Sequence, residues 1–321
     1  MTCPYALSWT IFFTESGNLI GIGSPSSPMN WVHHTRHVSD PFRIHWSVLR
    51  VGGAAVGLPD LAVGSPDEAR WASLGFPRPW PDRPWVFGVM VASANRVVAW
   101  RRRGPADDPV LQILGGAGRP ERIADRRLMR YLRSIGDGSI GAETVREQPQ
   151  LEPVPELYAF RAARGLSRHP RNVVYSRYGR VPLEHPIFNT SGLQAIVVTS
   201  PAGFALLSGA QAPAMTPKII AEPVLEREGL VRAHQRLFAE HHVRYLACEG
   251  GQTVLSALHG AGLLDEVFLT VTDVVIDEGA HDGVIRTFDF QAEGADLLAE
   301  GTISGDSGYT FQRWRFQEAR R

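Results

Sequence analysis

The sequence predicts an α/β domain with a mostly parallel central sheet, and the clearest support is the segment 243–275. An apolar run at 243–248 is too short for a helix and is followed by Gly250-Gly251, which indicates a buried strand and then a turn. A helical apolar pattern then leads to a second strand-like run at 267–271. Strand, turn, helix and strand in this order form a βαβ unit, and such units occur in mostly parallel sheets.

A second support is the alternation of strand-like and helical patterns from residue 83 onward, which gives about eight strands with four helices between them. One helical pattern carries the apolar stripe of Leu128, Met129 and Leu132, and another contains His234, which we interpret as a histidine at the edge of the core. The last segment is expected to be a closing strand, antiparallel at an edge of the sheet. The further strand-like segments are 85–92, 97–100, 138–140, 172–176, 194–199, 218–222 and 308–316.

The composition excludes several classes of protein. Thirty-three basic residues balance thirty-three acidic ones, so the chain lacks the electrostatic footprint of a nucleic-acid binder. No apolar stretch is long enough to span a bilayer, and the N-terminus lacks the pattern of a secretory signal. The two cysteines, Cys3 and Cys248, cannot form a disulfide framework or a multi-cysteine zinc site. We therefore expect a cytoplasmic protein that uses neither nucleic acid nor membrane as a partner.

The first 80 residues show no sustained helical or strand period and are expected to form a poorly ordered N-terminal extension, with the folded domain at 81–321. His33, His34 and His37 lie close together in this extension. Imidazoles can share a metal ion, but the chain offers no second ligand cluster at a credible spacing. We therefore predict no metal site.

The Gly250-Gly251 turn is the first candidate binding site. Two glycines at the end of a strand let the backbone approach a ligand, and the helix N-terminus that follows suits a phosphate. Thr253 could cap this helix or donate to the same anion, and Glu249 could bind a donor-rich polar ligand. An alternative remains open, in which the glycines only form a tight turn and Glu249 is solvated.

Three further strand ends carry candidate residues. The strand at 138–140 leads into a second turn, Gly141-Ala142-Glu143-Thr144, where a phosphate or a ribose could sit. The strands at 172–176 and 194–199 both end in hydroxyl residues, and Arg177 directly follows the first of them.

Four motifs together resemble the reductase domain of the riboflavin-biosynthesis deaminase/reductase family, whose fold is that of dihydrofolate reductase. They occur in the family's order at similar separations and cover roughly residues 81 to 321, which is more specific than any single motif. The segments are VRYLACEGGQTVLSALHGAGLLDEVFLTV, LMRYLRSIGDGSIGAETVREQP, VVYSRYGRVPLEHPIF and SGYTFQRW.

The resemblance implies a three-layer dihydrofolate-reductase-like fold with helices on both faces of the sheet. It also implies an NADPH-dependent reductase that passes hydride to C1′ of a ribosylamino-pyrimidine phosphate or acts on a related small molecule. Such an enzyme supplies binding and orientation, while the cofactor carries the hydride. The positions that match the family's cofactor site are Gly250, Gly251 and Thr253 for the pyrophosphate, Gly141, Thr144 and Val145 on the nicotinamide side, Ser176 and Arg177 for the 2′-phosphate, and Thr199 and Ser200 at the adenosine end.

The substrate side departs from the family pattern. The family has Ser-Leu-Asp-Gly after its first strand, whereas this chain has Ser93, Ala94, Asn95 and Arg96. The family's late Pro and Gly are replaced by Asp273 and Asp277, and the zinc-binding deaminase half is absent. The catalytic residues therefore stay unassigned, with Ser93, Asn95 and Glu249 as the candidates on the substrate side.

Two other functions stay open. The chain could be a degenerate family member that binds a nucleotide without turnover, as a sensor or an assembly partner. Alternatively, its N-terminal segment could carry a separate binding function. The resemblance also implies a homodimer.

Overall fold

The structure is a computed structural model that describes residues 42–48, 75–104, 106–147, 157–210, 213–224, 226–303 and 308–317. It also describes the backbone of short strands nearer the N-terminus, which are β1 (Thr10–Phe13), β2 (Leu19–Gly23), β4 (Arg50–Val51), β5 (Ala54–Ala55) and β6 (Leu61–Val63). The histidines at positions 33, 34 and 37 lie outside the described residues.

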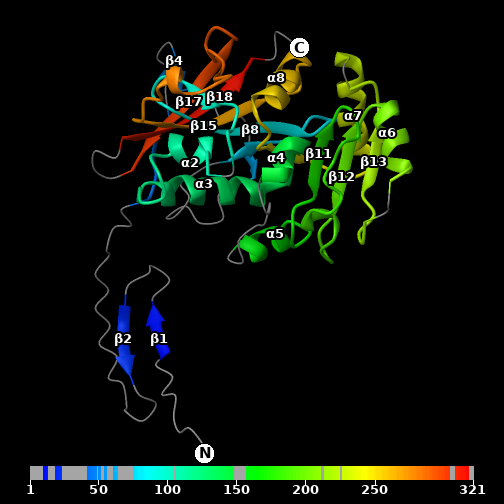
Figure 1. The fold of residues 1–321 in the computed structure, drawn as a ribbon. Helices are drawn as coiled ribbons and strands as arrows, with labels where there is room; N and C mark the ends of the chain where they lie inside the picture. Colours follow the sequence, from blue (N-terminus) through cyan, green and yellow to red (C-terminus); the bar gives the residue numbers. More distant parts are fainter. Residues whose placement is uncertain are drawn as a thin grey trace, which may run out of the picture.

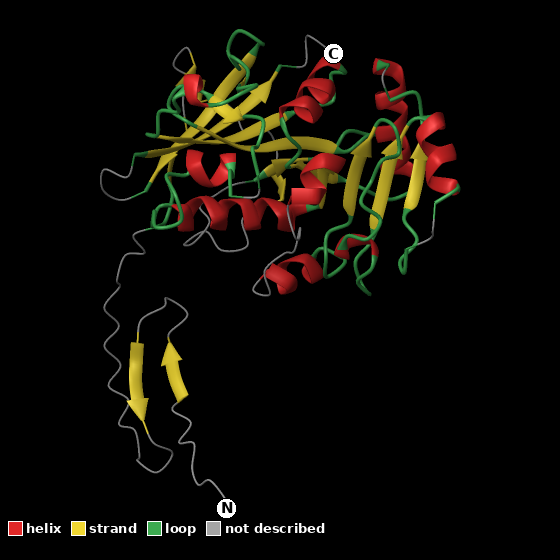
Figure 2. Cartoon of the chain, in the orientation of Figure 1, coloured by secondary structure: helices red, strands yellow, loops and turns green. Residues whose placement is uncertain are grey.

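Ten strands form one central sheet (Figures 1 and 2). In chain order they are β3 (His45–Val48), β8 (Trp85–Ala92), β10 (Asp137–Gly141), β11 (Asn172–Ser176), β12 (Ala195–Thr199), β13 (Lys218–Ala221), β14 (Tyr245–Cys248), β15 (Glu266–Thr272), β17 (Ala295–Thr302) and β18 (Tyr309–Phe316).

Their order across the sheet is β13-β12-β11-β10-β14-β8-β15-β18-β17-β3. Every pair from β13 to β15 is parallel, and the three remaining pairs are antiparallel. The prediction of a mostly parallel sheet is confirmed. Four shorter pairs of described strands lie outside this sheet: β1 with β2, β4 with β5, β6 with β7 (Phe76–Pro77), and β9 (Val97–Ala99) with β16 (Ile285–Arg286).

Helices cover both faces of the sheet, which confirms the three-layer prediction (Figure 1). Successive residues of a strand point to opposite faces, so Phe87 of β8 packs with Leu128 and Leu132 on one side, while Val86 packs with Leu255 on the other. Each fully buried leucine contributes roughly 1.5–3 kcal/mol to this packing. The helices are α2 (Pro109–Ile113), α3 (Arg122–Ile135), α4 (Ala142–Glu147), α5 (Tyr158–Ala163), α6 (Pro201–Ser208), α7 (Arg227–Ala239) and α8 (Gln252–Gly260), with 3₁₀ turns η2 (Pro186–Phe188) and η3 (Glu278–Ala280).

The position predicted for the last strand is wrong in one respect. β18 is antiparallel, as expected, but it lies inside the sheet between β15 and β17. β17 was missed because its sequence, ADLLAEGT, mixes two acidic residues and a glycine into an apolar run and so shows no clear period. The sheet therefore contains more than the predicted eight strands.

Several residues before position 81 pack against the domain. β3 pairs with β17, Phe76 is fully buried, and the carbonyl of Gly75 accepts a hydrogen bond from Arg313 at 2.8 Å. The domain boundary at residue 81 stays a prediction, but the chain on its N-terminal side contributes both a sheet strand and core residues.

The sheet order leads us to expect a ligand crevice at the carboxyl ends of β10 and β14. These strands are neighbours, with Gly138 opposite Ala247. From β10 the chain continues outward through α4 to β11, whereas from β14 it continues through α8 past β8 to β15. Because the two connections leave in opposite directions, this is a topological switch point, where open α/β sheets bind their ligands.

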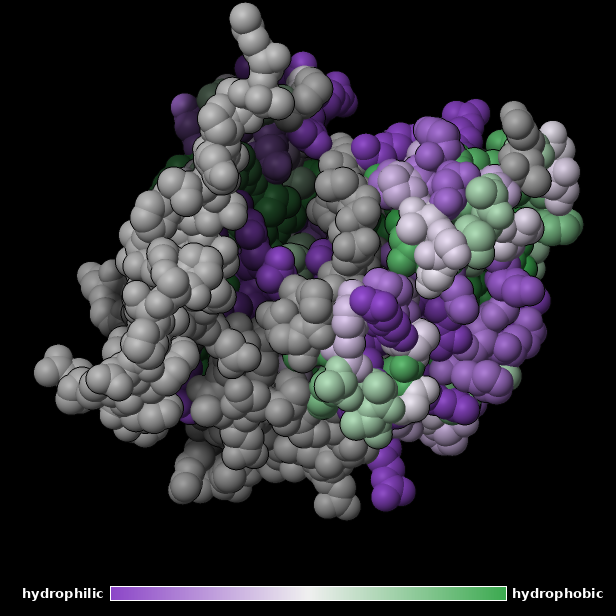
Figure 3. Space-filling view, turned by 90° about the horizontal axis from the view of Figure 1, so that it is seen from below, coloured by the Kyte–Doolittle hydropathy of each residue, from purple (hydrophilic) through white to green (hydrophobic). Residues whose placement is uncertain are grey.

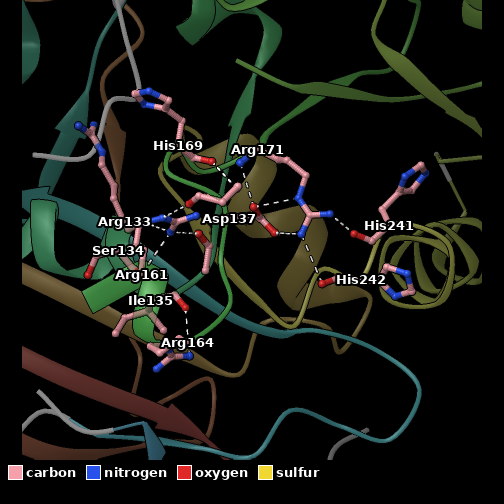
Figure 4. A network of polar contacts seen from close by, with 12 residues as sticks. Arg133, Ser134, Ile135, Asp137, Arg161, Arg164, His169, Arg171, His241 and His242 are labelled. Atoms are coloured by element: carbon pink, nitrogen blue, oxygen red, sulfur yellow. Dashed lines mark hydrogen bonds and ion pairs between the residues drawn. The ribbon is translucent and has the colours of Figure 1, made fainter. Parts of the chain in front are cut away.

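A buried polar network ties the C-terminal end of α3 to the start of β10 (Figure 4). Arg161 of α5 is fully buried and donates to the carbonyls of Arg133, Ser134 and Gly136, which end α3 without intrahelical partners. Burial lowers the pKa of Arg161 to about 10, so it stays charged at neutral pH. Beside it, Asp137 accepts two hydrogen bonds from the guanidinium of Arg171, at 3.1 and 2.7 Å. The network fixes the end of α3 relative to the first residues of β10.

Candidate active site at the sheet switch point

Two glycine turns meet at the carboxyl ends of β10 and β14. The N–H of Glu249 donates to the carbonyl of Ser139 at 2.9 Å, which extends the pairing of the strands up to the turns. A Cβ on Gly141 would lie 3.3 Å from Val254 of α8, so the first turn packs directly on the helix that follows the second. No side chain caps α8, whose N-terminal N–H groups therefore suit an anion.

Gly250 and Gly251 are glycines for different reasons. A Cβ on Gly250 would lie 2.9 Å from Cβ of Val254, so packing requires a glycine there. Gly251 has φ −59° and ψ 171°, which any residue adopts, and a Cβ there would meet no atom within 4 Å. The tight-turn interpretation explains the first glycine and not the second. The open space at Gly251 leaves room for a phosphate to approach the backbone.

Thr253 does not cap α8. The N-cap is Gly251, and Thr253 is exposed in the first helical turn. On the neighbouring turn, Thr144 is half-buried, whereas Val145 points into the core. Val145 can therefore meet a ligand only through its backbone.

The three hydroxyl residues at the ends of β11 and β12 are all engaged within the chain. Ser176 donates to the carbonyl of Arg180 at 3.2 Å, and Thr199 donates to the carbonyl of Ser176 at 2.6 Å. Ser200 accepts from the N–H of Gly203 at 3.1 Å and so caps α6. Since Ser200 only accepts, its O–H stays available to donate to a ligand.

Arg177 is exposed at the end of β11, with its guanidinium 4.9 Å from the ring centre of Tyr178. Farther along the chain, a surface depression of about 420 Å³ begins at Gly179, and Arg177 does not line it. Its lining comes from the loop after β11 and from α6, namely Gly179, Arg180, Val181, Leu183, Ala205, Leu206, Leu207, Gly209 and Ala210. The exposed guanidinium of Arg177 is by itself suited to a phosphate group.

The turn after β8 uses its polar side chains internally. Ser93 is fully buried, donates to Asn95 at 2.8 Å and accepts from the N–H of Val97 at 2.9 Å. The Asn95 amide donates to the carbonyl of Ile276 at 2.9 Å and accepts from its N–H at 3.0 Å. Arg96, at the family's glycine position, has φ +66°, in the left-handed region that glycine favours.

Glu249 is neither solvated nor free. Its carboxylate accepts two hydrogen bonds from Arg133 of α3, both at 2.5 Å, and its side chain is only 7% exposed. Arg133 lies in the last turn of a helix far away in the sequence, so only the folded sheet brings the two together. The positive charge of Arg133 therefore balances the negative charge of Glu249 at the end of β14.

Asp125, in the first turn of α3, is an acid that sequence reasoning did not place in the site. It is half-buried and accepts a hydrogen bond from the hydroxyl of Thr270 on β15 at 2.7 Å. Burial raises the pKa of its carboxyl, and the charge of Glu249 raises it further, while Thr270 and Arg122 oppose the shift. The only signal in the sequence was its place at a helix N-terminus, which also has a purely electrostatic explanation.

Two other titratable groups lie in the core behind the crevice. Burial raises the pKa of Cys248 to about 11, so its thiolate does not form at neutral pH. Burial also lowers the pKa of His234 to about 4, and the neutral ring contacts Tyr175 and the carbonyl of Leu230. His234 is thus a core histidine, as predicted. Among the residues that the structure describes, no cluster could hold a metal ion and no helix is long and apolar enough to cross a membrane.

Comparisons with known proteins agree with this architecture. A pyrimidine reductase-like protein from Corynebacterium diphtheriae is 20% identical with a TM-score of 0.52, over 74% of this chain and 93% of that one. RibD from Acinetobacter baumannii is 18% identical with a TM-score of 0.51, over 73% of this chain and 58% of that one.

A diaminohydroxyphosphoribosylaminopyrimidine deaminase/5-amino-6-(5-phosphoribosylamino)uracil reductase from Thermotoga maritima is 17% identical with a TM-score of 0.52. The alignment covers 73% of this chain and 57% of that one, so this chain spans less than two thirds of the Acinetobacter baumannii and Thermotoga maritima proteins. At these identities the likeness concerns the fold, and no curated protein sequence matches the chain. The sequence model of the RibD C-terminal domain, however, matches residues 111–292. Since that range exceeds half of the 321 residues, the chain belongs to the RibD C-terminal domain family.

Proposed function

We propose that this protein is an NADPH-dependent reductase. Its substrate would be 5-amino-6-(5-phosphoribosylamino)uracil, reduced at C1′, or a related small molecule. Family membership supports a reductase, and the name of the Thermotoga maritima protein supports the substrate class. The observation that carries the proposal is Gly251, whose missing side chain neither backbone conformation nor packing explains.

The proposed cofactor site lies along the carboxyl ends of the parallel strands. The N-terminus of α8 and the open position at Gly251 would hold the pyrophosphate, because unpaired N–H groups and the helix dipole favour an anion. Ser200 and Arg177 would contact the adenosine end, since both present donors at the ends of adjacent parallel strands. Gly141 and Thr144 would line the nicotinamide side. When bound, the nicotinamide supplies the hydride, and the chain supplies position and charge.

One observation favours the alternative of nucleotide binding without turnover. Ser93, Asn95 and Glu249, the substrate-side candidates, all have their polar groups engaged by other residues of the chain. A protein that binds NADPH and reduces no substrate would have this arrangement. Binding and turnover therefore need separate experiments.

Replacing Arg177 by Ala tests the 2′-phosphate site. We expect the affinity for NADPH to fall roughly 10- to 100-fold, because a charge-assisted contact worth about 1.5–3 kcal/mol is lost. The affinity for NADH, which has no 2′-phosphate, should stay within about threefold of the wild type. Calorimetric titration of both nucleotides measures the two affinities.

Arg168→Ala is the matched control. Arg168 is also exposed and also stacks on a tyrosine, Tyr158, at 4.4 Å, but it precedes β11 at the opposite end of the strand. Its loss should change neither affinity. Equal weakening of NADPH and NADH by Arg177→Ala would contradict a 2′-phosphate contact, and no binding of either nucleotide to the wild type would refute the cofactor site.

A further inference from the structure

The substrate side of the crevice lacks an available acid among the residues first expected there. Asn95 has replaced the family's Asp, and both ends of its amide are bound to the backbone of Ile276. The Glu249 carboxylate is held at both oxygens by Arg133. Ser93 is fully buried and bonded to its own turn. Reduction of a C=N or C=O bond nevertheless requires a proton as well as a hydride, so another group has to supply it.

Asp125 differs from these residues because only one of its carboxyl oxygens is engaged. Thr270 donates to Oδ1 at 2.7 Å, while Oδ2 has no hydrogen-bond partner among the residues that the structure describes. The residue is half-buried, so Oδ2 has neither a partner within the described chain nor the full hydration of a surface carboxylate. A carboxyl group that is oriented at one oxygen and available at the other suits proton transfer.

The backbone places Asp125 on the α3 side of the same crevice. Thr270 on β15 pairs with Val91 of β8, two residues before the turn at Ser93. The carboxylate of Glu249, at the end of β14, is near enough to act electrostatically on Asp125. Figure 3 views the molecule from below, the side on which α3 lies in Figure 1, and shows hydrophilic and hydrophobic residues mixed over the described part of this face. Asp125 therefore lies beside β15, next to the last residues of β8, and within electrostatic reach of the end of β14.

Its surroundings also favour the protonated form. Burial raises the pKa of the Asp125 carboxyl above the ordinary value, and the Glu249 charge acts in the same direction. Arg122, Arg126 and the Thr270 hydroxyl act against this shift without reversing it. A carboxylic acid with a raised pKa carries its proton closer to neutral pH, as a general acid must.

We propose that Asp125 is the acid of the reaction and that its Oδ2 delivers the proton taken up by the substrate heteroatom when hydride reaches the adjacent carbon. The new C–H bond takes its electron pair from the hydride, and the π pair of the C=N or C=O bond moves to the heteroatom. That atom then binds the proton released by Asp125, and the carboxylate regains a proton from solvent. The inference rests on the proposed function for its reductant, a reduced nicotinamide.

The test compares Asp125→Asn with Glu228→Gln. Asparagine keeps an oxygen for Thr270 and cannot release a proton, while Glu228 is an exposed acid in the first turn of α7 and serves as the matched control. Single-turnover hydride transfer from NADPH to 5-amino-6-(5-phosphoribosylamino)uracil is followed by absorbance from about pH 5 to about pH 9. Carbon-13 NMR of protein labelled at the aspartate carboxyls gives the Asp125 titration directly, and the signal missing in Asp125→Asn assigns it.

We expect Asp125→Asn to transfer hydride at least about 100-fold more slowly, with NADPH affinity unchanged. The wild-type rate should fall as the pH rises through the Asp125 pKa, because the acid form is lost, and the variant should lack this fall. Glu228→Gln should behave as the wild type. If the variant matches the wild type in rate and pH profile, Asp125 is not the acid, although the reductase function stands.

If the wild type transfers no hydride, the proposed function fails and the NMR titration decides the inference. A carboxyl signal that titrates in the ordinary aspartate range and does not move when the pyrimidine compound is added would overturn it. A signal with a raised pKa that moves on addition would support Asp125 as an acid in contact with the ligand.

Discussion

Gly251 gives a clean test of the site because its side chain is missing for no reason internal to the protein. Its φ and ψ suit any residue, and a Cβ there would meet no atom within 4 Å. At Gly250, by contrast, a Cβ would overlap Val254, so a substitution there would confound folding with binding. Position 251 therefore separates ligand binding from stability.

We predict that Gly251→Asp weakens NADPH binding at least about tenfold more than Gly251→Asn does. Both residues are good N-caps and nearly equal in size, so both should leave the free energy of unfolding unchanged or slightly raised. Only the aspartate places a negative charge where the pyrophosphate is expected. Equal affinities in the two variants, measured by calorimetric titration with urea unfolding as the check on folding, would refute the pyrophosphate position.

For single residues, the sequence predicts a position in the candidate site only when the residue belongs to a local motif. The positions of the glycine turns and of Arg177 were predictable, because each directly follows a strand and neighbouring parallel strands end on the same side of the sheet. The partners of Glu249 and Asp125 could not be found in the same way. Arg133 and Thr270 are distant in the chain, and only the strand order and the packing of α3 bring them into contact.

At the scale of elements, the turn after β8 and the loop after β15 are joined through Asn95. Its amide donates to the carbonyl of Ile276 at 2.9 Å and to a carboxylate oxygen of Glu278 at 3.2 Å, and it accepts from the N–H of Ile276 at 3.0 Å. An aspartate, the family residue, cannot donate to these oxygens and would also face the negative charge of Glu278. The departure from the family pattern thus has a structural role in this chain.

We predict that Asn95→Asp lowers the free energy of unfolding by about 1–3 kcal/mol at neutral pH, because two half-buried acceptors lose their donor. Urea unfolding measures the change. Asn189→Asp is the matched control, since the Asn189 amide also donates to two oxygens, both carbonyls, and accepts from one N–H, but it is exposed, where water replaces the lost donor. An equal fall in the free energy of unfolding of both variants would show that the link through Asn95 does not stabilise the protein.

Element prediction succeeded where the hydrophobic period was strong. The bounds of β8 and β11 agree with the sequence prediction, because β8 is a long apolar run and β11 is centred on two buried valines, both within the parallel part of the sheet. α6 was missed because it is short, begins at Pro201 and includes Gly203, which packs against the Thr199 hydroxyl. The edge position predicted for β18 failed because β17 was not recognised, so nothing in the pattern indicated a further strand beyond it.

At the scale of the whole molecule, buried ion pairs join segments that the sequence presents separately. Asp265 accepts from both terminal nitrogens of Arg83 at 2.9 Å, and Glu266 accepts from Arg313 at 2.8 Å. Arg313 in turn donates to the carbonyl of Gly75, before the predicted domain boundary.

The fold class and the family were predictable from motifs and their order. The strand order was not, because it depends on where α8 carries the chain after β14. The boundary at residue 81 and the homodimer stay predictions.

We propose above that this chain reduces a substrate with NADPH. The most direct measurement mixes purified protein with NADPH and 5-amino-6-(5-phosphoribosylamino)uracil and follows both the nucleotide absorbance and the product mass. We predict loss of NADPH that depends on the pyrimidine compound, with one product molecule, heavier by two hydrogens, formed per NADPH consumed. Tight NADPH binding without consumption, with this compound and with related imines and carbonyls, would contradict the claim and favour a nucleotide-binding protein without turnover.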